Sequence, residues 1–143
     1  MPREVEYVHT KANDPKWKMP YTPAVKVRSG SLVFLAGVTA AGVYHSHPHD
    51  DAEFATIPED PSEQARLMME NLIEVLAAAG GGLTDVVSFI KFMVDTEANQ
   101  DAINQVVGSY FKSHRPASTL VEVIRLAPSP RLLVEISAIA VID

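Results

Sequence analysis

The last apolar stretch of the sequence, LLVEISAIAVI at residues 132–142, constrains the fold more than any other segment. Its β-branched residues are typical of a strand, in which successive side chains point to opposite faces. One face carries only apolar residues: Leu132, Val134, Ile136, Ala138, Ala140 and Ile142. The other face is also largely apolar and consists of Leu133, Glu135, Ser137, Ile139 and Val141. Because both faces need cover, the sequence predicts helices against the first face and another copy of the chain against the second.

Two amphipathic helices are available to cover the first face. Asp60 can cap the earlier one, Pro61 takes the favoured first position, and Glu63 completes a predicted capping box. The glycines at 80–82 end this helix. Its apolar stripe consists of Ala65, Met68, Met69, Leu72, Leu76 and Ala79. The later helix starts near residue 95 or 96, and its stripe consists of Ile103, Val106, Val107 and Tyr110.

The remaining β-rich runs predict the rest of a mixed sheet. AVKVRSGSLVFLAG at 24–37 reads as a hairpin around RSGS, with a possible extra strand before it at 3–10. DVVSFIKFMVD at 85–95 is a further strand, and the proline-marked turn at 127–131 predicts a hairpin between 118–126 and 132–142. The order β-β-α-β-α-β-β predicts one α+β domain over residues 1–143, with two helices packed on one face of the sheet.

Composition excludes several classes of protein. The length of 143 residues suits one domain, and a net charge of −6 disfavours nucleic acid as a partner. The absence of cysteine excludes a disulfide framework, a thiolate nucleophile and a cysteine-based zinc site. No apolar run reaches the roughly 18 residues of a membrane span, and the charged start lacks the apolar core of an export signal. We therefore expect a cytoplasmic protein with no membrane partner.

Glu135 is the first candidate for chemistry. Its sequence neighbours are apolar, so its carboxyl should be partly buried, and burial raises the pKa of a carboxyl towards the range of a general acid or base. The alternative, which the residues alone favour, is a structural glutamate that pairs with Arg125 or Arg131 or faces solvent at an edge.

A long polar loop at 38–60 contains a second candidate. His45, His47 and His49 alternate along it, and in an extended chain three imidazoles could converge on a metal. Pro48 interrupts that regularity and no distant ligand is marked, so the sequence favours a solvated loop and predicts no metal site.

The hydroxyl pair Ser118 and Thr119 is the third candidate. A serine nucleophile needs a base and an oxyanion hole, and the chain has no G-x-S-x-G elbow to provide them. Both hydroxyls are therefore predicted to donate or accept hydrogen bonds rather than to attack a substrate.

Several segments together resemble one known family. They are QARLMMENLIEVLAAAGGGLTDVVSFIKFMVD, NQVVGSYF, RPASTLVEVIRL and LLVEISAIAVI, with a looser match in PYTPAVKVRSGSLVFLAG. In order and spacing they are similar to the RidA/YjgF family, also called endoribonuclease L-PSP, over about residues 20–142. The resemblance implies a chorismate-mutase-like α+β fold and a homotrimer with its active sites between subunits. It also implies hydrolysis of reactive enamines and imines, such as 2-aminoacrylate, to keto acids and ammonia without a cofactor.

The resemblance also implies roles for individual residues. Glu135 matches the glutamate that positions water, Asn104 matches a helix asparagine near the site, and Tyr21 matches the tyrosine at its entrance. Three positions depart from the family pattern. Ser118 replaces the arginine that clamps the substrate carboxylate, Ala36 replaces a serine before Gly37, and Leu120 replaces a cysteine.

The loss of the arginine bears directly on function, because serine cannot give a carboxylate a bidentate, charge-assisted grip. Arg115, Lys91 and the histidine loop are alternative sources of positive charge. The predicted function is a divergent hydrolase of this type, in which Ser118 and Thr119 bind the polar end of a small substrate and the backbone near Gly37 can hydrogen-bond to it. The alternative is a non-catalytic trimer that binds a small ligand, and RNA cleavage is a third, disfavoured reading.

Overall fold

The computed structural model describes all 143 residues and has the predicted α+β architecture. Its strands are β1 (Glu4–Val8), β2 (Ala24–Ser29), β3 (Ser31–Phe34), β4 (Val86–Val94), β5 (Ala117–Val123) and β6 (Val134–Ile142). Its helices are α1 (Pro61–Ala78) and α2 (Thr96–Phe111), with short 3-10 turns η1 (Asp51–Phe54) and η2 (Leu83–Asp85). The possible strand at the start is confirmed as β1. Neither helix is long and apolar enough to cross a membrane.

Four strands form a mixed sheet in the order β3-β6-β4-β5, and β1 and β2 form a separate antiparallel pair. β6 runs antiparallel to β3 and β4, whereas β4 and β5 are parallel. A parallel pair needs a crossover connection, and α2 provides it. The strand with two apolar faces therefore lies inside the sheet, where both edges of its backbone are hydrogen-bonded.

Both predicted hairpins are wrong. β5 pairs with β4 rather than β6, because the crossover through α2 returns the chain at the outer edge of β4, and β6 then inserts between β3 and β4. The run around RSGS also divides, since β2 pairs with β1 and β3 pairs with β6. Gly30, between β2 and β3, has φ +119°, a conformation that favours glycine and lets the chain pass from one sheet to the other.

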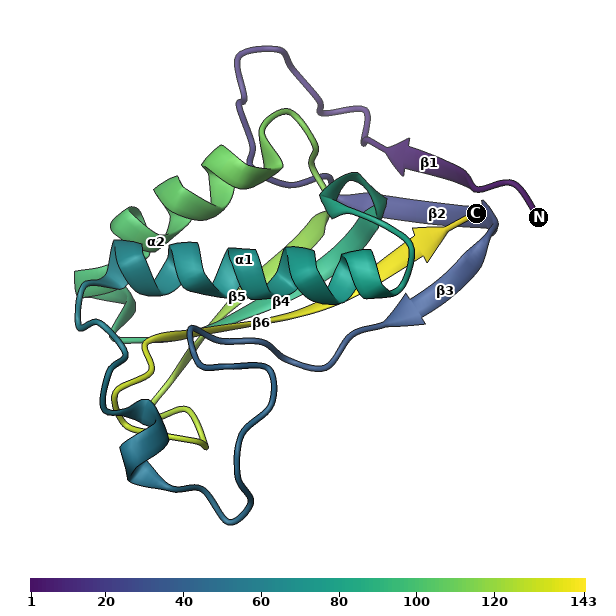
Figure 1. Cartoon of the computed structure of the whole chain (residues 1–143). Helices are drawn as coiled ribbons and strands as arrows, with labels where there is room; N and C mark the ends of the chain where they lie inside the picture. Colours follow the sequence, from purple (N-terminus) through teal and green to yellow (C-terminus); the bar gives the residue numbers. More distant parts are fainter.

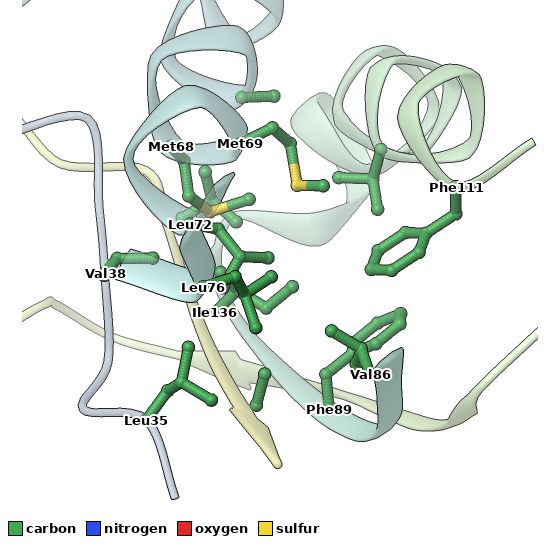
Figure 2. Close-up of a cluster of buried hydrophobic side chains, with 14 of the residues drawn as sticks. Leu35, Val38, Met68, Met69, Leu72, Leu76, Val86, Phe89, Phe111 and Ile136 are labelled. Atoms are coloured by element: carbon green, nitrogen blue, oxygen red, sulfur yellow. The ribbon is translucent and has the colours of Figure 1, made fainter. Parts of the chain in front are cut away.

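The helices pack on one face of the four-stranded sheet, α1 against β6 and α2 against β4 (Figure 1). The predicted stripe of α1 is confirmed from Ala65 to Leu76, where Met68, Leu72 and Leu76 are fully buried beside Ile136 (Figure 2), but Ala79, at the end of the helix, is exposed. α2 buries Ile103 as predicted, and it also buries Phe111, which stacks on Phe89 of β4 at 5.1 Å between ring centroids.

The ends of α1 follow the sequence with one difference. Asp60 caps the helix by accepting a hydrogen bond from the backbone N–H of Glu63, and Gly80 after it adopts φ +89°. The predicted capping box is only half formed, because the Glu63 carboxylate accepts instead from Arg66 Nε at 2.9 Å.

The second face of the sheet carries no helix. On β6 the predicted alternation holds from Leu132 to Ala140, with one set of side chains buried and the other half-buried. It breaks at the end, where Val141 is buried against Gly30 and Ile142 is half-buried. Large apolar side chains stay open on this face, and Phe34 is 73% exposed.

Candidate active site

The residues predicted for the site line two separate cavities within one chain. The helix-side cavity has a volume of about 300 Å³ and is bounded by α2, β4 and β5. Its lining includes six predicted residues: Tyr21, Asn104, Arg115, Ser118, Thr119 and Leu120. The glutamate cavity has a volume of about 150 Å³ and includes the other three, Ala36, Gly37 and Glu135. Every predicted site residue thus lines a cavity, but no single cavity contains them all.

Strand register explains the separation. On β4, Lys91 is opposite Ile136, and the next residue, Phe92, is opposite Glu135. Ile136 is fully buried under the helices, so Lys91 lies on the helix side of the sheet. Glu135 is one residue away from Ile136 on β6 and therefore points to the opposite side.

Lys91 is the second cation of the helix-side cavity beside Arg115, and the sequence named it only as an alternative source of positive charge. Its Nζ donates to Asn104 Oδ1 at 2.5 Å, and burial lowers the pKa of this lysine. No aspartate or glutamate lines the cavity, and the ion pairs of the chain do not involve Lys91. The sequence carries a signal for it, because Lys91 is the only charge in the otherwise apolar run VVSFIKFMV. An unpaired ammonium in a partly dry cavity favours binding of an anion.

Ser118 lies close to Lys91 because of the parallel pairing of β4 and β5. Ser118 is opposite Phe89 and Leu120 is opposite Lys91, so these side chains share the helix side of the sheet. Ser118 is half-buried. Thr119 contributes to the lining of the cavity but is opposite Ile90, so its side chain points to the other face of the sheet, and the two hydroxyls predicted to bind substrate together are divided. Ser118 stands where the family pattern has arginine, and Lys91 is the next side chain along β4 on the same face of the sheet. A cation is therefore present near this position although the arginine is not.

Arg115 and Tyr21 form the mouth of the helix-side cavity. The Arg115 guanidinium donates to three backbone carbonyls, those of Met19, Lys112 and His114. The buried Thr22 ties the same segment to the start of β5, since its hydroxyl donates to the Arg115 carbonyl. Arg115 thus fixes the segment before Tyr21 against the end of α2. Most of its N–H donors are used in these contacts and are not free for a substrate.

Glu135 has no ion-pair partner, so the alternative in which it pairs with Arg125 or Arg131 is not found. Its carboxyl is partly buried, and this desolvation raises its pKa. Gly37 provides the space for the carboxyl, because a Cβ at that position would lie 2.8 Å from Glu135 Cδ. The loop that carries Gly37 is fixed by backbone hydrogen bonds of 2.9 Å in both directions between Val38 and Ile136.

The histidine loop borders the glutamate cavity. His45 lines that cavity, and one ring nitrogen from each of His45, His47 and His49 lies within 4.8 Å of the other two. The structure therefore brings together three imidazoles for which the sequence favoured a solvated loop.

Comparison with known proteins identifies one family and several relatives that match most of the chain. The family model described as endoribonuclease L-PSP matches residues 11–142. The protein DfrA of Myxococcus xanthus is 37% identical over 127 residues, which are 89% of this chain and 88% of that protein. The 3-aminoacrylate deaminase RutC of Acinetobacter baylyi is 33% identical over 121 residues, 85% of this chain and 86% of that protein.

Solved structures share the fold. A Rid-family protein of unknown function from Yersinia pestis, YyfB, superposes with a TM-score of 0.75 at 27% identity, over 96% of this chain and 98% of that one. Escherichia coli TdcF, solved with bound serine, superposes with a TM-score of 0.64 at 30% identity, over 87% and 90% of the two chains. A curated counterpart in strain K12 is named putative reactive intermediate deaminase TdcF, and it is 32% identical over 125 residues, 85% of this chain and 86% of that protein.

Proposed function

This chain belongs to the endoribonuclease L-PSP family, also called the RidA/YjgF family, and we propose on that premise that it is a deaminase that hydrolyses small reactive imines or enamines. In such a reaction water adds to the carbon of the C=N bond and the nitrogen takes up a proton. Cleavage of the C–N bond then releases ammonia and leaves a carbonyl product. The names of two relatives, 3-aminoacrylate deaminase and reactive intermediate deaminase, support this class of substrate.

The unpaired carboxyl of Glu135 is the observation that carries the proposal. It is half-buried at a cavity, its pKa is raised by desolvation, and Gly37 leaves open the space beside it. A carboxylate in such a place can accept a proton from water as the water attacks, and then return a proton to the departing nitrogen. A structural glutamate would be expected to have a partner that offsets the cost of its burial.

Lys91 supplies the grip for the acidic end of the substrate. Its ammonium is held by Asn104 in a cavity that has no carboxylate, and it shares the helix side of the sheet with Ser118. A lysine is a point charge rather than a planar fork, so it holds a carboxylate with less directional selectivity than an arginine. We therefore expect broader tolerance among small anionic substrates.

The reaction needs both cavities, and the sheet separates them within one chain. Assembly of a homotrimer would resolve this, because a second copy that covers the open face of the sheet could bring its own helix-side cavity to the glutamate cavity. The apolar side chains exposed on that face support such an assembly; they include Leu32, Phe34, Ile90 and Val121.

The proposed deaminase is tested by the release of ammonia from 2-aminoacrylate and 3-aminoacrylate generated enzymatically in the assay. The wild type should accelerate release above the spontaneous rate, and Glu135→Gln, which keeps the shape but not the base, should lower kcat by about 10²- to 10⁴-fold. An exposed glutamate, Glu74, offers a matched control, since Glu74→Gln should leave the rate unchanged.

The alternative function, a non-catalytic trimer that binds a small ligand, predicts a different result in the same assay. Small keto acids would change the fluorescence of Trp17, which lies with Tyr21 at a neighbouring cavity, but no variant or wild-type protein would release ammonia. Binding of keto acids without turnover of any imine would contradict the deaminase.

A further inference from the structure

We propose that His45, His47 and His49 form a binding site for one zinc ion per chain. Their donor nitrogens lie within 4.8 Å of one another, and the three ring centroids are separated by 4.7, 4.9 and 5.2 Å. Nitrogens bound to one tetrahedral zinc at 2.0–2.1 Å are about 3.3 Å apart. The nitrogens therefore lie at most about 1.5 Å farther apart than zinc ligands do, a gap that rotation of the side chains has to close.

The loop around the histidines is built rather than loosely solvated. The Glu53 carboxylate accepts from the Ser46 backbone N–H at 2.9 Å and from the Ser46 hydroxyl at 2.5 Å, which ties the segment between two of the histidines to η1. Asp50 caps η1 by accepting from the N–H of Ala52. The rings of His45 and His49 pack at 5.6 and 6.0 Å from that of Phe54, which is only 1% exposed.

The hydrogen bonding of His45 fits a zinc ligand. Its Nδ1 lies 3.3 Å from the carbonyl oxygen of Gly42, and a carbonyl can only accept, so Nδ1 carries the proton. That tautomer leaves Nε2 with a free lone pair for a metal. Zinc-bound histidines usually donate their second ring nitrogen to a carbonyl or carboxylate in this way.

Charge and donor type favour zinc over a hard cation. Asp50, Asp51 and Glu53 follow the histidines directly, so the local field attracts a cation. Imidazole nitrogens suit zinc and its neighbours in the first transition row, whereas calcium and magnesium require oxygen ligands. Three histidines leave a fourth position for water or for an anionic group.

The histidine loop lies at the glutamate cavity, so a cation bound there would add positive charge beside Glu135. His45 also lines the glutamate cavity, whose lining includes no lysine or arginine. A zinc ion on the loop would place a positive charge at the rim of a cavity whose own ionised group is acidic. The proposal concerns metal binding alone and stands independently of the deaminase proposed above.

The test uses the full chain without a histidine tag, stripped of metal with a chelator and dialysed. Zinc titration followed by calorimetry should give one site per chain with a dissociation constant on the order of 1 µM or below. Native mass spectrometry should show the same stoichiometry. Cobalt(II) added in place of zinc should give the visible absorption of a tetrahedral complex, and a hundredfold excess of calcium should not displace zinc.

Two ligand variants and one control locate the site. His47→Ala and His49→Ala remove exposed side chains and should each weaken zinc binding about a hundredfold or more. His9→Ala removes an exposed histidine outside the cluster and should leave the affinity unchanged. Equal affinity in wild type and His47→Ala, or an equal loss in His9→Ala, would overturn the proposal, as would weak binding of several zinc ions per chain.

Discussion

The helix-side cavity and the glutamate cavity differ in charge and in surroundings. The first lies beside the helix-packed core, contains an ammonium and has no carboxylate in its lining. The second lies under the loop that carries Gly37, receives the Glu135 carboxyl from the other face of the sheet, and has no lysine or arginine in its lining. Each cavity thus has one half of what hydrolysis of a small anionic imine requires. The difference teaches that strand alternation alone can divide a site. Lys91 is opposite Ile136, the neighbour of Glu135 on β6, and yet Lys91 and Glu135 line two different cavities.

The charge of the helix-side cavity can be removed without a change of size. Lys91→Met should raise KM for an anionic substrate about 30-fold, the equivalent of roughly 2 kcal/mol for a lost hydrogen bond to a charged group. kcat should change much less, because this cavity is proposed to hold the substrate rather than to activate water. Steady-state ammonia release measures both constants.

Lys26→Met is the control for that substitution, since Lys26 lies on β2 in an exposed pair with Glu6. It should leave KM unchanged. A KM in Lys91→Met equal to that of the wild type would show that the ammonium does not contact the substrate.

Co-expression of two impaired variants tests whether the cavities belong to one site. In a mixed assembly, a Glu135→Gln chain contributes an intact helix-side cavity and a Lys91→Met chain contributes an intact glutamate cavity. If each site spans two chains, about one quarter of the sites in a random 1:1 mixture has both intact halves. At substrate concentrations well below KM, where the rate reports kcat/KM, activity should therefore recover several-fold above either variant alone, with purified mixed assemblies assayed for ammonia release.

The same two substitutions placed in one chain give the control for mixing. The double variant co-expressed with wild type also has about one quarter of fully intact interfaces if sites span two chains, but about one half if each site lies within one chain. Suppose that the mixture of double variant and wild type has about one half of the wild-type activity, and that the mixture of single variants shows no recovery. Each active site would then lie within one subunit.

The sequence predicted the elements better than their pairing. The stripe of α1 and the two-faced pattern of β6 depend on residues close in the chain, and both are found except at their ends, where Ala79 is exposed and Val141 is buried. Pairing depends on distant segments, and local proline and glycine signals at 127–131 and at RSGS suggested hairpins that the crossover through α2 excludes. The same limit left Lys91 as one of three alternative sources of positive charge, because only the register of β4 against β5 shows that it shares a face of the sheet with Ser118.

The space around Glu135 is tested by Gly37→Ala. The added Cβ would lie 2.8 Å from Glu135 Cδ, so the carboxyl must move, and overpacking of this kind costs about 1–3 kcal/mol. A displaced base should lower kcat roughly fivefold with little effect on KM. Kinetics and chemical denaturation measure the two effects.

Gly82→Ala is the matched glycine control, because a Cβ there would meet nothing within 4 Å. Its activity should equal that of the wild type. If Gly37→Ala behaves in the same way as Gly82→Ala, the carboxyl of Glu135 does not depend on the space that Gly37 leaves.

The smallest expected effect is the change that pH causes in the contribution of Glu135 to the free energy of unfolding. This change also reports whether the Glu135 carboxyl lies close to a cation in the assembly. Burial raises the pKa of Glu135 in the folded protein above the usual 4.5, so the folded state holds this proton more tightly than the unfolded state. The contribution of Glu135 to stability is therefore fully present below the unfolded pKa and is lost as pH rises through the folded pKa. The free energy of unfolding of the wild type, minus that of Glu135→Gln, should fall over this range and then stay level. A difference that rises with pH in metal-free protein would mean that a cation lowers the pKa of Glu135 in the assembly. Loss of that rise in Lys91→Met would place the Lys91 ammonium of a neighbouring copy directly against the carboxyl, without room for a substrate between them.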